Sequence, residues 1–165
     1  MKITLKRGEA QDRLRFDRLM QLYIYDFTDI VDFDLNEEGL FETTRLDSYF
    51  SDETKNPFLI FAGDVLAGFV LVSGEVFLPE NTGGRCIREF FVVRKHRRSG
   101  VGKEAASQIF SMLSGKWEVR VMRENANAEK FWEIAIGEYT QGNYKKERRD
   151  SGEWLGTIFS FDSSE

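Results

Sequence analysis

The sequence predicts an α/β (α+β) fold in which helices pack on one mixed β-sheet. Apolar residues recur at helical spacing from Gln11 to Phe27. Short apolar runs typical of strands occupy Asn56 to Ala62 and Val65 to Ser73. The 165 residues contain no internal repeat, low-complexity tract or linker, so we expect a single domain over residues 1–165.

The first half of the chain is expected to form an edge strand, a long helix and a hairpin. Met1 to Lys6 predicts the edge strand, and the helix from Gln11 to Phe27 follows it. Asp26 to Glu42 predicts a loop with room for a short helix, and Leu46 to Phe50 a short helical turn. Gly63-Asp64 is a tight-turn pair, so the two apolar runs around it should be antiparallel neighbours.

The second half alternates between strands and helices. The breakers Pro79, Gly83 and Gly84 indicate a loop before the next strand. The expected elements are a strand over Ile87 to Val93, a helix over Glu104 to Leu113, a strand over Trp117 to Val121, a helix from Asn125, and a final strand pair over Tyr139 to Lys145 and Trp154 to Phe161, joined by a charged loop.

Composition excludes several classes of protein. The 28 acidic and 23 basic residues give a net charge of −5, which argues against a nucleic-acid binder. Cys86 is the only cysteine, so no intramolecular disulfide can form, and one Cys with one His makes a zinc or haem site unexpected. No apolar stretch is long enough for a signal peptide or a membrane span. We therefore expect a soluble, cytoplasmic protein with no metal and no membrane partner.

The stretch from Arg97 to Lys103 is a basic, glycine-containing turn between a predicted strand and a predicted helix. Glycine lets the backbone approach a ligand closely, and a helix start offers unpaired N–H groups, so the stretch suits phosphate. It fits neither the dinucleotide fingerprint nor the P-loop, because Glu104 follows Gly102-Lys103 and no glycine stands at position 97. A plain turn with solvated arginines is the competing interpretation.

Two motifs resemble those of the GNAT superfamily of CoA-dependent N-acyltransferases. The first reads Arg/Gln-x-x-Gly-x-Gly/Ala between a strand and a helix, and the second reads Asn-x-x-Ala-x-x-Phe-Tyr on a later helix. The matching residues are Arg97, Gly100 and Gly102 for the first, and Asn125, Ala128, Phe131 and Trp132 for the second, with Trp in place of Tyr. The order of elements over essentially the whole chain is also similar.

The resemblance implies a sheet that splays beside the Ile87 to Val93 strand and takes up acetyl-CoA as co-substrate. The backbone of Phe91, Val92 and Val93 would pair with the pantetheine arm. Asn125 would contact pantetheine or act as a plain N-cap. The pyrophosphate would be held by backbone amides and side-chain charge from Arg97, Arg98, Ser99, Gly100, Val101, Gly102 and Lys103.

The implied reaction needs a base, because a primary amine is almost wholly protonated at neutral pH. Glu89 is the candidate, since it interrupts an apolar strand where a charge is costly unless used or paired. A salt bridge with Arg88 or Arg120 is the alternative role. Trp132 cannot act as the proton donor that the motif tyrosine supplies. The donor is therefore Tyr139 or Tyr144, or the thiolate leaves unaided, or the protein is catalytically weak.

Cys86 and His96 are less suited to chemistry. Cys86 is expected to be a buried structural thiol rather than a nucleophile. His96 is expected to be exposed in the loop before Arg97.

Acidic and aromatic residues alternate between Arg18 and Arg45, and this stretch is the candidate acceptor wall. Such a wall attracts a cationic amine, although a solvated acidic loop has the same composition. The candidate substrate-binding residues are Tyr23, Tyr25, Asp26 and Asp29. We expect an N-acetyltransferase that acts on a small-molecule or peptide amine in a ternary complex. The alternative is a non-catalytic CoA-binding sensor, and a homodimer remains open.

Overall fold

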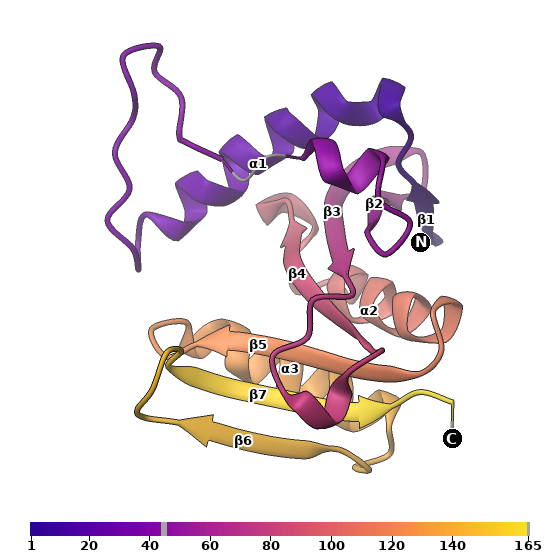
Figure 1. Ribbon diagram of the computed structural model, residues 1–165. Coiled ribbons are helices and arrows are strands. Elements are labelled where there is room, and N and C mark those ends of the chain that lie inside the picture. Colours follow the sequence, from indigo (N-terminus) through magenta and orange to yellow (C-terminus); the bar gives the residue numbers. More distant parts are fainter. Residues whose placement is uncertain (44–45, 165) are drawn as a thin grey trace.

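A seven-stranded mixed sheet runs through the part of the chain that the computed structural model describes, residues 1–43 and 46–164 (Figure 1). The strand order is β1-β2-β3-β4-β5-β7-β6, and neighbours are antiparallel except β4 with β5. This confirms the predicted mixed α/β fold. The strands are β1 (Ile3–Arg7), β2 (Asn56–Ala62), β3 (Val65–Ser73), β4 (Arg85–Val92), β5 (Lys116–Met122), β6 (Lys145–Arg149) and β7 (Gly156–Asp162).

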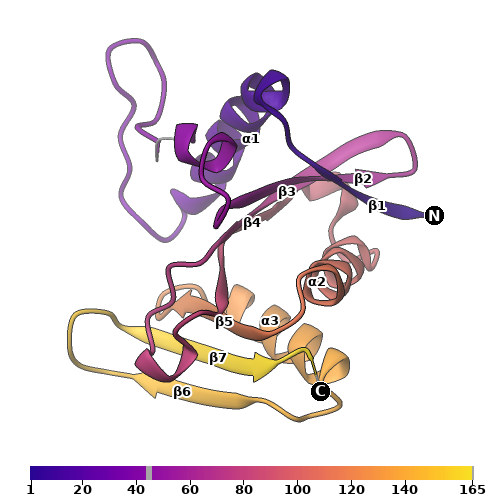
Figure 2. The ribbon, with the colours of Figure 1, turned by 45° about the vertical axis from the view of Figure 1, so that its right-hand side comes forward.

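Helices cover both faces of this sheet (Figure 2). The amphipathic helix α1 (Arg13–Phe27) buries Phe16, Leu19 and Met20 against β2 and β3. On the other face, α2 (Val101–Met112) and α3 (Ala126–Tyr139) share a core with β4, β5 and β7. Short 3₁₀ turns lie at Ala10–Asp12, Asp47–Phe50, Pro79–Asn81 and Arg94–His96. None of the described helices is long and apolar enough to cross a membrane.

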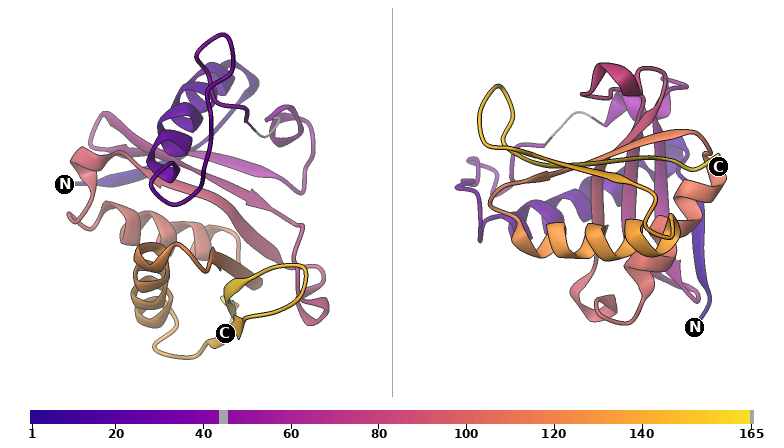
Figure 3. Two further views of the ribbon diagram at one scale, coloured as in Figure 1. Left: turned by 90° about the vertical axis from the view of Figure 1, so that its left-hand side faces the viewer. Right: turned by 90° about the horizontal axis from the view of Figure 1, so that it is seen from below.

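The sheet splits between its two parallel strands. Strands β4 and β5 pair only from Arg85 opposite Trp117 to Ile87 opposite Val119, and beyond that point they diverge (Figures 1 and 3). A β-bulge adds to the local irregularity, because Ile87 faces Val72 while Glu89 faces Leu71, which leaves Arg88 as the extra residue. Bulges twist a strand and re-aim its side chains. The predicted splay is confirmed.

Two expectations about local structure are wrong. Tyr139 ends α3 instead of beginning a strand, and a turn follows with Gln141 and Gly142 at positive φ. The strand is β6, which lies in the segment expected to be a charged loop. It is an edge strand that pairs its backbone with β7 and exposes nearly all its side chains, so it has no apolar alternation. Residues 28–42 contain no helix and form a projecting loop closed by a bridge between Leu35 and Phe41 (Figure 1).

Candidate active site

A cleft of about 580 Å³ opens where β4 and β5 diverge. Its walls come from α1, β4, β5 and α3, together with Trp154, which lies just before β7. Aromatic and charged side chains share this lining, including Tyr23, Glu89, Phe90, Arg120, Trp132 and Trp154. A cleft of this size, with few polar groups among aromatic ones, is typical of small-molecule sites.

Glu89 and Tyr23 meet in this cleft from opposite elements, β4 and α1. Burial raises the pKa of the Glu89 carboxyl above its ordinary value, and a hydrogen bond from Tyr23 and the charge of Arg88 offset this only in part. The pKa of Tyr23 is raised well above its ordinary value by burial and by the neighbouring Glu89 carboxylate. A carboxylate with a raised pKa is better matched to accepting a proton near neutral pH.

The turn before α2 presents a row of free backbone donors. Gly100 is the N-cap of α2 in a left-handed conformation with φ +85°, and Arg98 is also left-handed with φ 59°. None of the six N–H groups from Arg98 to Lys103 donates to any residue that the structure describes; the first helical bond runs from Glu104 N–H to Gly100 C=O at 3.0 Å. Free N–H groups at the positive end of a helix dipole suit a phosphate group.

Gly102 has a separate, steric role. A Cβ at this position would lie 3.2 Å from the Phe131 ring and 3.6 Å from Phe90. The first turn of α2 therefore packs closely on aromatic side chains of α3 and β4. Both motif glycines are explained by the structure, Gly100 by its φ and Gly102 by this close approach.

The charged side chains of the loop are already engaged. Arg97 donates its Nε–H to the Val92 carbonyl at 2.7 Å and also bonds the Asp26 carboxylate of α1. Arg94 donates to the same Asp26 carboxylate at 2.9 Å. Burial raises the pKa of Asp26, but the hydrogen bonds from Arg97 and Arg94 outweigh it and lower the pKa overall. Lys103 pairs with Glu138 of α3 at 2.6 Å.

The edge of β4 that faces the cleft has free backbone groups. Val93 N–H donates to Ala67 C=O of β3 at 2.8 Å, so its donor is occupied. Along a strand, the backbone N–H and C=O groups of successive residues point to opposite edges. The Phe91 backbone shares the Val93 side, with its carbonyl against Gly68, whereas the backbone groups of Val92 point to the opposite edge, where the carbonyl accepts from Arg97. Of the three residues predicted to pair with pantetheine, Val92 is the one with its N–H on the open edge.

The second motif divides its residues between capping and packing. Asn125 accepts a hydrogen bond from Ala128 N–H at 3.1 Å, which is N-capping, and it also lines the cleft. Trp132 is 5% exposed and packs edge-on against Phe90 with ring centroids 4.9 Å apart. Its indole therefore forms a wall of the cleft.

The tyrosines considered as proton donors lie elsewhere. Tyr139 accepts a hydrogen bond from Ser111 at 3.3 Å. It lines a second groove of about 790 Å³, which residues 1–3, α2, α3 and the turn residues Ser99 and Gly100 surround. Tyr144 packs on Phe159, with ring centroids 6.0 Å apart. Neither lines the cleft that holds Glu89, so the structure does not bring Tyr139 and Glu89 together.

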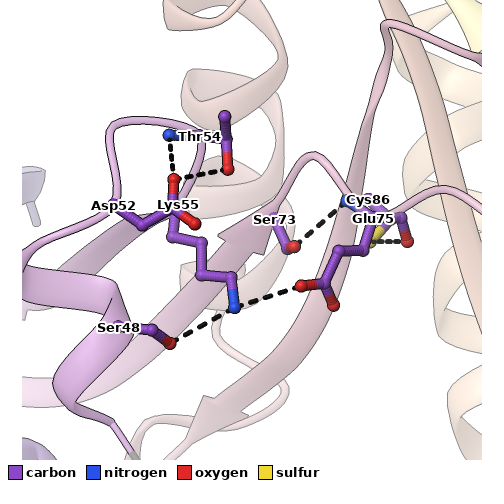
Figure 4. A network of polar contacts seen from close by, with 7 residues as sticks. All are labelled: Ser48, Asp52, Thr54, Lys55, Ser73, Glu75 and Cys86. Carbon is purple, nitrogen blue, oxygen red and sulfur yellow. Dashed lines mark hydrogen bonds and ion pairs between the residues drawn. The ribbon is translucent and has the colours of Figure 1, made fainter.

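Cys86 and His96 are both buried. Cys86 donates its S–H to the Glu75 carbonyl at 3.3 Å, within the polar network that includes Lys55 and Ser73 (Figure 4). Burial raises the pKa of the Cys86 thiol, which disfavours the nucleophilic thiolate. The expectation of an exposed His96 is wrong: it is 9% exposed, because the 3₁₀ turn Arg94–His96 folds it inward.

Of the four predicted acceptor residues, only Tyr23 lines the cleft. Tyr25 is 63% exposed, Asp29 is also exposed, and Asp26 is held by the two arginines. Residues that the sequence reasoning did not assign to the acceptor side are Arg88, Arg120 and Trp154. The sequence of β5 does contain a signal for Arg120. Its core residues Trp117, Val119 and Val121 alternate with polar positions, so Arg120 lies on the face of the sheet opposite to that core.

A split sheet, a turn with free N–H groups and a half-buried carboxylate together characterise a class of protein, and comparisons agree with it. The model of the acetyltransferase (GNAT) family matches residues 16–137. Because this match spans well over half of the chain, the protein belongs to the GNAT acetyltransferase family. None of the curated proteins compared with the chain matches it significantly.

Solved structures share this fold at low sequence identity. An acetyltransferase from Thermus thermophilus is 16% identical, with a TM-score of 0.67 over 98% of this chain and 97% of that one. An aminoglycoside acetyltransferase in complex with coenzyme A and kanamycin is 11% identical, with a TM-score of 0.67 over 98% and 95%. Spermidine N-acetyltransferase from Vibrio cholerae, in complex with CoA and spermine, is 14% identical, with a TM-score of 0.61 over 98% and 96%.

Proposed function

We propose that this protein is an acetyl-CoA-dependent N-acetyltransferase that acetylates a primary amine by direct attack in a ternary complex. One observation carries the proposal: β4 holds the half-buried Glu89 and leads, a few residues after its end, into the turn whose N–H groups from Arg98 to Lys103 are free. Solved structures of the same fold contain coenzyme A together with an amine. The family membership and this geometry support the same reaction.

In this proposal each group has a defined task. The N–H row before α2 binds the pyrophosphate, and the open edge of β4 at Val92 pairs with the pantetheine arm. The Val92 N–H donates to the thioester oxygen on which negative charge develops. Glu89 takes the proton of the ammonium group, directly or through water, so that the free amine attacks the thioester carbon. The bond to sulfur then breaks as the nitrogen gives its second proton to water, which leaves the amide and the CoA thiolate.

The thiolate leaves without help from the motif position. Trp132 has no acidic proton, and Tyr139 and Tyr144 lie outside the cleft. A thiol has a pKa of about 8.5, so its conjugate base is an acceptable leaving group near neutral pH. The lack of a tyrosine at the motif position also favours a second candidate, a CoA-binding sensor that no longer catalyses transfer.

Calorimetric titration with acetyl-CoA, followed by an assay of thiol release with a panel of primary amines, tests the proposal. Cys86 is buried, so it adds little background to a thiol reagent. Gly100→Trp should weaken acetyl-CoA binding at least tenfold, because it combines a strained φ with a bulky group over the N–H row. Gly83→Trp is the matched control, since Gly83 has φ +83° and equally open surroundings. Absence of binding overturns both candidates, and binding without thiol release with any amine selects the sensor.

A further inference from the structure

Two arginine side chains line the cleft. Arg88 of β4 and Arg120 of β5 both line it, and neither makes an ion pair with any residue in the described ranges. Both lie close enough to Cys86 that their charges act on its thiol. Two unpaired guanidinium groups in a partly enclosed site favour an anion.

Two acidic side chains near this end of the cleft are engaged with other groups. Glu75 pairs with Lys55 at 3.1 Å (Figure 4). Glu118 is fully buried, and its carboxylate accepts hydrogen bonds from the Phe77 and Leu78 N–H groups at 2.9–3.4 Å.

Glu89 and Glu42 also line the cleft, and the charge of Arg88 acts on Glu89. Neither carboxylate forms an ion pair with Arg88 or Arg120 in the described ranges, so both guanidinium groups stay available to a ligand anion.

Packing holds Arg120 in position. Its guanidinium carbon lies 5.6 Å from the centre of the Phe77 ring, and Arg149 approaches the same ring to 5.0 Å. Phe77 is itself fixed by its hydrogen bonds to Glu118 and packs on Trp154 with ring centroids 6.4 Å apart. An arginine that is held before the ligand arrives loses less conformational freedom on binding.

The bulge in β4 places Arg88 beside Glu89, the proposed base. Arg88 is its extra residue and directly precedes Glu89, and both side chains line the cleft. An acceptor whose amine meets Glu89 therefore has its neighbouring atoms next to Arg88 and Arg120. We propose that the acceptor is an amino acid, with its carboxylate bound by Arg88 and Arg120 and its amino group facing Glu89. This inference rests on the proposed acetyltransferase function and names its acceptor class.

Matched pairs of acceptors test the inference: phenylalanine with phenethylamine, and leucine with its decarboxylated amine. The wild-type protein should prefer each amino acid by at least about tenfold in kcat/KM, the loss expected when a charge-assisted bidentate contact is missing. Arg120→Gln and Arg88→Gln should each bring this ratio toward one, mainly by raising KM for the amino acid. Arg148→Gln, an exposed arginine of β6 that pairs with Asp150, should leave the ratio unchanged.

A wild-type ratio at or below one overturns the inference, as does an equal loss for both members of a pair in the arginine variants. In either case acetylation of the decarboxylated amine keeps the proposed function intact. A binding measurement adds a readout that does not need turnover. With CoA present, the amino acid should raise the Tm of the wild type but not that of Arg120→Gln. Failure of acetyl-CoA binding would remove the proposed function and the acceptor assignment together.

Discussion

Replacing Tyr23 by Phe should raise the pKa of Glu89 further. The substitution removes the hydroxyl that stabilises the ionised carboxylate and leaves the ring among Phe27, Phe69 and Phe91. A hydrogen bond to a charged group contributes about 1.5–3 kcal/mol. Because Glu89 is only half-buried and water can replace part of the bond, we take the lower end. One pKa unit corresponds to about 1.36 kcal/mol, so the expected rise is about one unit.

The pH dependence of kcat/KM measures this shift, with one amine used for every variant. The ascending limb of the pH profile, which reports the ionisation of Glu89, should shift to higher pH by about one unit in Tyr23→Phe. A direct titration of isotope-labelled glutamate by NMR should give the same shift without reference to turnover. Tyr25→Phe is the control, because Tyr25 is 63% exposed and lies outside the cleft. An unchanged or lower pKa of Glu89 in Tyr23→Phe would refute the assigned Tyr23–Glu89 contact.

Three further predictions concern stability. Glu89→Gln should lower kcat/KM by about 10²–10⁴ yet increase the free energy of unfolding at pH 7. The pKa of Glu89 is raised in the folded protein, so this carboxyl contributes favourably to the free energy of unfolding at low pH. That contribution is lost as the pH rises through the folded pKa. Urea unfolding should therefore show no gain in stability for Glu89→Gln below about pH 4. Asp26→Asn should lower the free energy of unfolding by about 1 kcal/mol at pH 7, since two partly exposed ion pairs are lost. The pKa of Asp26 is lowered in the folded protein, so the difference in stability between wild type and variant should vanish as the pH falls through that pKa. Gly68→Ala should cost about 3 kcal/mol, because its Cβ would lie 2.0 Å from the Phe91 carbonyl oxygen, whereas Gly137→Ala, in open helix surroundings, should stabilise by about 0.5–1 kcal/mol. An equal effect of the two alanine substitutions in urea unfolding would contradict the close approach of β3 and β4.

Features determined by neighbouring residues were predictable from the sequence. The hairpin around Gly63 has its turn residues and its apolar strands within one short segment. The start of α3 at Asn125 depends on a side chain that bonds a backbone group three residues later. The turn before α2 depends in the same way on the positive φ of Gly100. In each case the physical cause lies within a few residues.

Features that depend on distant residues were not predictable from one sequence. The Asp26–Arg97 contact joins residues 71 positions apart, and it changes Asp26 from a candidate acceptor ligand into a partner of the loop. The meeting of Tyr23 with Glu89 and of Arg88 with Arg120 depends on how α1 and β5 are placed around β4. Strand β6 is a tertiary effect as well, since only its partner β7 makes that charged segment extended.

The short parallel seam between β4 and β5 has a mechanical consequence. Within the described residues, sheet hydrogen bonds join the two halves of the sheet only through the three pairs from Arg85 to Ile87. The halves can therefore change their mutual angle at this seam without breaking any other strand pairing, as in hinge motion. The width of the cleft and the separation of Arg88 from Arg120 would change together, because those two residues lie on opposite sides of the seam. Under the proposed acceptor assignment, selection among acceptors would then also depend on how far the sheet opens.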